Sequence, residues 1–277
     1  MWPDADDTVS RWKQKLSPFS GIFALLFVWE VGIRLSKGSI LPTPWAVVKG
    51  IGELITKGVL FRYIVASLFR VTWGYVTAVV LAIPLGLCLG WYQRAERAVN
   101  PFLQIFRPIS PLAWIPIAIL WFGVGDQPAI FIIFLGSFFP LTVAAMNSVS
   151  NVSATHLNIG RNFGYSNFRI LTKIVYPAVL PQLIVGMRLS LGIAWLVVVA
   201  AEMIAVSSGL GYLIVEARNA GDRYDLVVAG MLLIGAIGLG LDAGMRRLEG
   251  LKAVRWSYAA EARTDTIRHV ERRRRAR

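Results

Sequence analysis

The chain has 277 residues, of which 56% are hydrophobic and only 16% are charged, and its formal net charge is +13. Soluble domains are about 45–50% apolar and about 25% charged, so this composition predicts several membrane spans instead of one large soluble core. A positive balance in such a chain indicates basic cytoplasmic loops, and we expect membrane lipid, not nucleic acid, as a partner. The single cysteine, Cys88, excludes an internal disulfide, and with only two histidines we expect no metal site.

The first apolar run, residues 21–35, follows a polar stretch at residues 1–19. The run has no small-residue cleavage site, so we expect an uncleaved first span. It carries Glu30 and Arg34 four residues apart. These two side chains either form a charge pair within the membrane or lie near its boundary. We expect the boundary, because Arg34 can there reach the lipid headgroups.

The second span, residues 64–91, follows a polar connection at 36–63, in which residues 45–56 are expected to form a short interfacial helix. The span contains small residues four apart, which let helices approach closely in lipid. These residues are Gly74, Ala78, Ala82, Gly86 and Gly90.

Prolines interrupt the third span, residues 99–124, which follows an expected basic turn at residues 92–98. The four prolines, which exclude one straight helix, are Pro101, Pro108, Pro111 and Pro116. Broken helices at membrane depth are tolerated only where they face protein or a watery cavity, so this segment is the first candidate for lining a transport pathway. The fourth span is expected at residues 129–146.

Residues 154–177 are the longest polar interruption of the apolar region, with three cations and no acid. The spacing of their apolar residues predicts two short amphipathic helices that break near Gly164 and end at Pro177. A basic helical hairpin between two spans is suited to contact with a soluble partner. The alternative is a cytoplasmic loop that only connects the spans.

Two more apolar runs, residues 180–206 and 226–245, are expected as the fifth and sixth spans. Arg188 lies near the start of the fifth span and Glu202 near its end, and a basic tail follows at residues 246–277. Cations gather in the N-terminal segment, the first basic turn, the hairpin and the tail. The positive-inside rule therefore predicts six spans with both termini in the cytoplasm.

Residues 154–177 resemble the cytoplasmic coupling loop of ABC importer permeases. That family's pattern is Glu-Ala-Ala, three residues, Gly, nine residues, Ile, one residue, Leu-Pro, and Gly164, Ile174 and Pro177 stand at the required spacing. The chain departs from the pattern at Asn158, Ile159, Gly160 and Tyr176. Three further stretches resemble the branch of the family that imports nitrate, bicarbonate, taurine and alkanesulfonates. They are residues 107–116, 121–125 and 200–203.

The resemblance implies an all-α membrane domain at residues 20–247 with about six transmembrane helices, between cytoplasmic segments at 1–19 and 248–277. It implies the permease subunit of an ATP-driven importer for a small anion, with nitrate expected first and bicarbonate, taurine or alkanesulfonate as alternatives. The expected partners are a second copy of the chain, cytoplasmic ABC ATPase subunits and a periplasmic or lipid-anchored solute-binding protein, at the bacterial cytoplasmic membrane.

The chain itself has no phosphate-binding loop and no nucleophile elbow. We therefore expect no catalytic residue and no cofactor in it, with ATP and Mg²⁺ bound by the ATPase. The residues expected to contact that ATPase are Asn158, Ile159, Gly160, Arg161, Gly164, Arg169, Lys173, Ile174 and Pro177.

Six side chains are expected along the transport pathway, namely Ser110, Trp114, Trp121, Ser137, Trp195 and Glu202. Ser110 lies between prolines, where freed backbone amides suit an anion. The tryptophans either line the pathway or serve at membrane interfaces and helix contacts. Glu202 either contacts an amine-bearing solute or braces its span by pairing with Arg188 or a backbone group. Bracing is expected, because a bare carboxylate repels anions.

A stand-alone secondary transporter or channel is the alternative from another class. It would need ionisable groups within the membrane, and only Glu30, Arg34, Arg188 and Glu202 are expected to qualify, mostly near span ends. It would also leave the 154–177 hairpin without a role.

Overall fold

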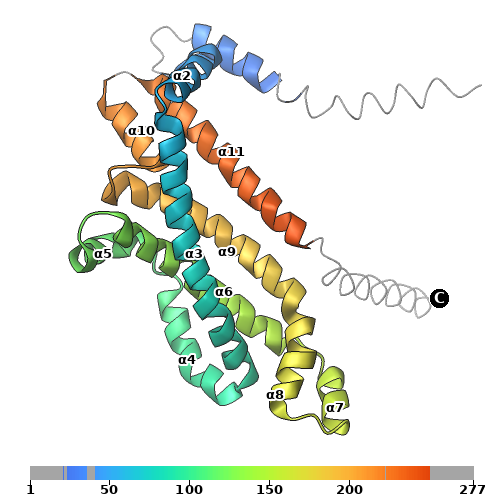
Figure 1. Cartoon of the computed structure of the whole chain (residues 1–277). Coiled ribbons are helices and arrows are strands. Elements are labelled where there is room, and N and C mark those ends of the chain that lie inside the picture. Colours follow the sequence, from blue (N-terminus) through green and yellow to red (C-terminus); the bar gives the residue numbers. More distant parts are fainter. Residues whose placement is uncertain (1–20, 22–23, 36–40, 222, 250–277) are drawn as a thin grey trace, which may run out of the picture. The chain divides into compact units, whose positions relative to one another are not determined.

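The computed structural model describes residues 21, 24–35, 41–221 and 223–249, and every regular element in them is a helix (Figure 1). After a helical segment at residues 24–35, the elements are α2 (Pro44–Thr56), α3 (Val59–Trp91), α4 (Gln93–Phe106), the 3₁₀ helix η1 (Pro111–Trp114), α5 (Ile115–Phe122), α6 (Asp126–Ser150), α7 (Ala154–Asn162), α8 (Asn167–Ile170), the π turn η2 (Leu171–Val175), α9 (Tyr176–Ala205), α10 (Leu210–Asn219) and α11 (Tyr224–Glu249).

Four helical stretches of the described residues are long and apolar enough to cross a membrane. They are Val59–Trp91, Asp126–Ser150, Asn167–Ala205 and Tyr224–Glu249. They confirm the second, fourth, fifth and sixth predicted spans, and the chain is an all-α membrane protein. A fifth span results if the bent pair Gln93–Phe106 and Pro111–Phe122 is counted as one. The first predicted span lies partly outside the described residues.

The third span is broken, as its prolines predict. The helix pair α4 and η1–α5 is bent by 83°. Pro111 opens η1 and Pro116 lies in the first turn of α5, where a proline leaves no helical hydrogen bond unmade. The expected basic turn at residues 92–98 was wrong, because only Tyr92 lies outside a helix there. Gln93–Phe106 forms α4 instead, since its first residues are good helix formers.

The small residues of α3 are the places where it packs closely on α6. A Cβ atom at Gly86 would lie 2.6 Å from the carbonyl oxygen of Thr142, and one at Gly90 would lie 2.6 Å from that of Met146. Ala78 is completely buried. The prediction that this row of small residues permits a close helix contact is confirmed, and its partner is α6.

The described residues divide into two compact units. The first lies within residues 1–63 and 213–233 and includes α2. In it, Arg223 and Lys57 both donate to the Glu53 carboxylate, and these two hydrogen bonds lower the pKa of Glu53 to about 2. The second unit, within residues 64–212 and 234–277, contains the hairpin and the buried polar network described next.

Candidate functional site

The predicted hairpin is present, and its break is at Gly164. This residue follows α7 with a φ of +69°. Its N–H donates to the carbonyl of Arg161 at 2.9 Å, and the N–H of Tyr165 donates to that of Gly160 at 3.0 Å. These two bonds are the Schellman motif, which ends a helix with a left-handed residue and so favours glycine.

The second arm of the hairpin continues into a membrane span. The prediction that Pro177 ends the hairpin was wrong, because helical backbone runs from Asn167 to Ala205. Within it, the N–H of Tyr176 donates to the carbonyl of Leu171, five residues back, as in a π turn. Pro177 is the second residue of α9. The wider turn accommodates a residue that has no N–H of its own to donate, so the helix continues.

Gly160 allows α7 to pack directly on this continuous helix. A Cβ atom at Gly160 would lie 2.5 Å from Cδ1 of Ile174 and 3.2 Å from Cγ1 of Ile170. Ile170 in turn belongs to a buried cluster with Ala145 and Val149 of α6. Since interiors of this kind are closely packed, a displacement of α7 would be passed to α9 and α6.

The outer face of the hairpin combines large apolar side chains with cations. Phe163 is 77% exposed and Phe168 is 74% exposed. Arg161, Arg169 and Lys173 are also exposed. Of the other residues expected to contact an ATPase, Asn158, Ile159 and Gly164 are exposed, Gly160 is buried, and Ile174 and Pro177 are half-buried. This is a surface of the kind that partner proteins cover.

A buried ion pair lies towards the other end of α9 from the hairpin. Nη1 of Arg70, on α3, donates to Oε1 of Glu202, on α9, at 2.8 Å, and the two side chains are 2% and 0% exposed. The other carboxylate oxygen of Glu202 accepts from the Ser67 hydroxyl at 2.8 Å and from the Gly211 N–H at 2.9 Å. Within the described part of the chain, no buried side-chain polar atom lacks a hydrogen bond. The pair therefore meets the condition under which buried charges are tolerated.

Arg70 also ties the network to two further elements. Its Nε donates to Oδ1 of Asp126 at 2.7 Å, and its Nη1 donates to the carbonyl of Ser208 at 2.8 Å. Asp126 starts α6, and Ser208 precedes α10. Next to it, Gly209 has a φ of +107°, and a Cβ atom there would overlap the Glu202 carboxylate. The loop before α10 is thus folded around that carboxylate, and only glycine fits.

The sequence analysis did not identify Arg70, and it gave Glu202 the wrong side-chain partner. Arg188 pairs with Glu249 at 2.9 Å and with Asp242 at 3.1 Å, both on α11, and not with Glu202. The expected backbone partner of Glu202 is confirmed. One signal for Arg70 was available, since an arginine inside a long apolar run needs a partner. Arg70 also adds to the ionisable groups that were expected within the spans.

Three of the expected pathway residues lie along the broken span. Ser110, between α4 and η1, is exposed. The Trp114 ring lies against Phe106, with ring centroids 6.2 Å apart, and the exposed Trp121 ring lies edge-on to Phe131 at 5.9 Å. All three residues have surface open to a partner or a solute.

The other three expected pathway residues are buried in the second unit. The Ser137 hydroxyl donates to the carbonyl of Ile133 in its own helix, at 2.9 Å. The indole N–H of Trp195 donates to the carbonyl of Ile234, on α11, at 3.1 Å. Glu202 is held in the network above. In the single chain, each of these polar groups is already hydrogen-bonded.

Comparison with protein families places residues 78–251 in one model, described as binding-protein-dependent transport system inner membrane component. Three relatives are similar over most of their length. A putative aliphatic sulfonates transport permease protein of Bacillus subtilis is 34% identical over 86% of both chains. The taurine transport system permease protein of Escherichia coli is 30% identical over 86% of this chain and 91% of its own. A bicarbonate transport system permease protein of Synechococcus elongatus is 32% identical over 84% of this chain and 89% of its own.

Among solved structures, a chain of the MetNI methionine ABC transporter in an inward-facing conformation is similar in fold. The TM-score is 0.61 at 18% sequence identity, over 70% of this chain and 95% of that one. At this level of identity the likeness concerns the fold alone.

Proposed function

Because the chain belongs to the family of binding-protein-dependent inner-membrane transport components, in the branch that includes sulfonate, taurine and bicarbonate permeases, we propose that its 154–177 hairpin couples transport to a separate ATPase. The chain would form the membrane path, and the ATPase would bind ATP and Mg²⁺ and supply the movement.

The observation that supports this role best is the construction of the hairpin. Its outer face presents exposed Phe163 and Phe168 beside cations, which suits a protein partner with acidic groups. Its inner face packs closely, at Gly160, against Ile170 and Ile174. A partner that moves the hairpin would therefore move α9 and α6 as well, and such an element can be biased between two states by nucleotide.

We propose further that two copies of the chain enclose the pathway in a bacterial cytoplasmic membrane, with both termini inside. A solute-binding protein would deliver the solute to the side opposite the hairpin. The exposed Ser110 and Trp121 and the half-buried Trp114 of the broken span are our candidates for the pathway wall. Ser137, Trp195 and Glu202 are proposed there only if the dimer or another state frees their polar groups, and otherwise they brace helices.

The solute is proposed to be a small oxyanion. The relatives are named for aliphatic sulfonates, taurine and bicarbonate, which supports these three as the first solutes to test. Nitrate, expected from the residues around Ser110, is the fourth. All four carry an anionic group whose oxygen atoms accept hydrogen bonds, and taurine carries an ammonium group as well.

Co-purification of the tagged full-length chain from membranes tests the function. We expect a stoichiometric ABC ATPase whose hydrolysis is stimulated by the chain, and we expect it to be lost when residues 158–174 are scrambled. A chain that purifies alone and moves anions in liposomes without ATP would favour the stand-alone transporter.

A matched pair of variants tests the hairpin itself. Gly164→Val places a β-branched residue at a positive φ, which costs about 1–2 kcal/mol, whereas Gly164→Asn is tolerated there. No atom lies within 4 Å of a Cβ at this position, so the two variants differ in backbone strain and not in clashes. We expect Gly164→Val to lower transport-coupled ATP hydrolysis several-fold and Gly164→Asn to retain it. Equal activities would remove the turn from the mechanism.

A further inference from the structure

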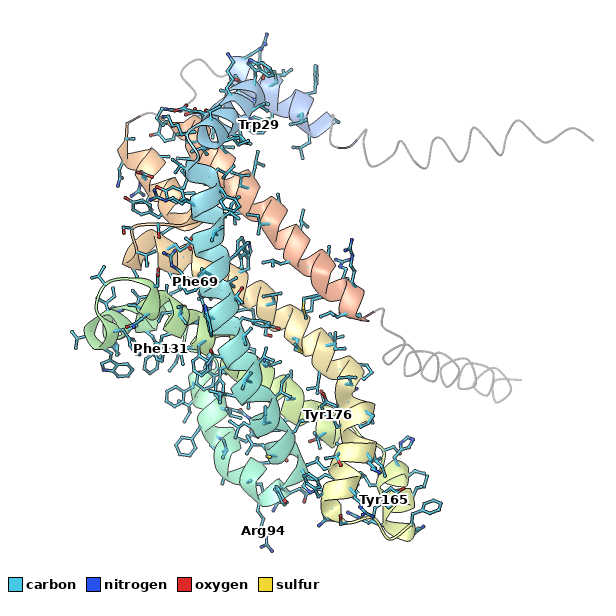
Figure 2. The ribbon with its side chains drawn as sticks, in the orientation of Figure 1. Trp29, Phe69, Arg94, Phe131, Tyr165 and Tyr176 are labelled. Atoms are coloured by element: carbon cyan, nitrogen blue, oxygen red, sulfur yellow. The ribbon has the colours of Figure 1, made fainter. Side chains whose placement is uncertain are left out.

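A concave surface lies beside the hairpin in the same unit. It is a cleft of about 720 Å³ between the turn that joins α3 to α4 and the helix α7. Its apolar lining includes Trp91, Leu157 and Val175, and its lining cations are Arg94 and Arg161. Figure 2 shows Arg94 at the α3–α4 turn and Tyr165 in the hairpin, at the same end of the unit.

The walls of this cleft are held in place before any partner binds. At the end of α3, a Cβ atom on Gly90 would lie 2.7 Å from Cβ of Val149, so α3 touches the end of α6 directly. Leu157 of α7 packs against the cluster that contains Val149 and Val175. Because both walls rest on the same packed core, the cleft is preformed, and binding in it costs little ordering.

The charge of the cleft selects the kind of occupant. Arg94 and Arg161 form no ion pair with any residue that the structure describes, and Glu96 is the only carboxylate in the lining. Apolar surface flanked by two free guanidinium groups is complementary to a segment that offers an apolar side chain next to carboxylates. The chain's own tail ends in an arginine run and has the wrong charge.

We propose that this cleft is a second docking site for the ATPase subunit and that it takes an acidic segment carrying an apolar side chain. The inference rests on the proposed function, and it extends the ATPase contact from the hairpin to the α3–α4 turn. The two surfaces are continuous, because Arg161 belongs both to the hairpin and to the lining of the cleft.

This second contact gives the ATPase a hold on a different part of the membrane domain. The hairpin leads into α9, whereas the α3–α4 turn leads into α4, the first arm of the broken span that is bent by 83°. One partner would then act on α9 and on α4. The bent segment would follow the ATPase directly instead of only through α6.

The test uses one matched pair of charge reversals in the full chain. Arg94→Glu has its control in Arg97→Glu, which is exposed on the same helix but does not line the cleft. The probe is the ATPase that co-purifies with the wild-type chain, identified by mass spectrometry and nucleotide hydrolysis. Its dissociation constant is measured for each variant after thermal unfolding has shown that the variant is folded.

We expect Arg94→Glu to weaken ATPase binding about tenfold and Arg97→Glu to change it less than about twofold, because only Arg94 faces the cleft. A Glu→Lys or Asp→Lys change in the ATPase that restores binding to Arg94→Glu identifies the acidic segment.

Equal effects of Arg94→Glu and Arg97→Glu on ATPase binding would overturn the docking site. They would show that only the net charge of this region matters. A loss of ATPase binding by Arg94→Glu that occurs only in vesicles containing anionic lipid would assign the cleft to lipid headgroups. That result would also overturn the docking site. If the wild-type chain binds no ATPase, the proposed function itself fails. If the wild type binds and Arg94→Glu binds equally well, only the cleft inference fails.

Discussion

Arg70 connects four parts of the second unit through one guanidinium group. It lies on α3, pairs with Glu202 on α9 and Asp126 on α6, and donates a hydrogen bond to the loop carbonyl of Ser208. Its neighbours on the carboxylate, Ser67 and the Gly211 N–H, hold Glu202 but supply no positive charge. The charge balance of the buried network therefore depends on a single side chain.

Replacing Arg70 with methionine should destabilise the protein strongly. The change leaves Glu202 buried without a counter-charge, and removing one partner of a buried pair costs about 3–5 kcal/mol. Asp126→Asn breaks the other ion pair of Arg70, but the Asp126 side chain is 53% exposed, so we expect a loss of about 0–1 kcal/mol. Thermal unfolding of the detergent-solubilised chain measures both. The double variant Arg70→Met with Glu202→Gln should recover much of the loss, and similar shifts for Arg70→Met and Asp126→Asn would contradict this assignment.

The identity of the partner could not be predicted from the sequence. Residues 70 and 202 are separated by 132 positions, and a charge in an apolar run shows only that some partner is needed. Arg188 was named as a partner because it lies in the same span as Glu202, but 14 residues correspond to about 21 Å along a helix, which is too far for an ion pair. The fold decides otherwise, since Arg188 is met by Asp242 and Glu249 of α11.

At the scale of the helices, α3 can approach α6 closely because glycines of α3 have no side chain at the contact. Gly86→Ala would place a methyl group 2.6 Å from the Thr142 carbonyl, a backbone atom that can move only if the helices separate. Gly192→Ala on α9 meets no atom within 4 Å. We expect Gly86→Ala to cost about 1–3 kcal/mol and Gly192→Ala to be neutral or to stabilise by up to about 1 kcal/mol. Unfolding midpoints in detergent give the comparison, and a harmless Gly86→Ala would show that the two helices are not in close contact.

Most of the elements follow from hydropathy and proline positions, and the exceptions have physical reasons. The spans at α3, α6, α9 and α11 and the interruption of the third span by prolines were predicted correctly, although Pro101 lies inside α4 and does not break it. Pro177 was read as a helix end because a proline in a helix interior leaves a carbonyl unpaired. The π turn that removes this conflict depends on the packing around Ile170 and Val175, which no local pattern reveals. The helix α10 was likewise not expected, because its N-terminal amides are satisfied by the distant Ser67 and Glu202.

At the scale of the whole molecule, the hairpin and the turn before α6 are expected on opposite sides of the membrane. Val124 is 83% exposed and Phe163 is 77% exposed, and Cys88 is the chain's only cysteine. In a Cys88→Ser background, Val124→Cys should react with a membrane-impermeant maleimide in intact spheroplasts. Phe163→Cys should react only after the membranes are opened, because the positive-inside rule predicts that the basic hairpin lies in the cytoplasm. The reverse pattern of labelling would invert the proposed orientation and separate the hairpin from a cytoplasmic ATPase.

The π turn at Leu171–Val175 has a consequence for the direction in which the hairpin faces. Such a turn holds one residue more than a turn of α-helix within about the same rotation, so it absorbs the extra residue locally and keeps the helix on either side in phase. A deletion of one residue here would give an unbroken α-helix in which Phe168 and Arg169 keep their present side. A deletion in the α-helical part of α9 would instead rotate them by about 100° around the helix axis. The second arm of the hairpin therefore tolerates a change of chain length at this turn and at no other place along the helix, and an alignment of related chains that places a gap here superimposes faces pointing in the same direction.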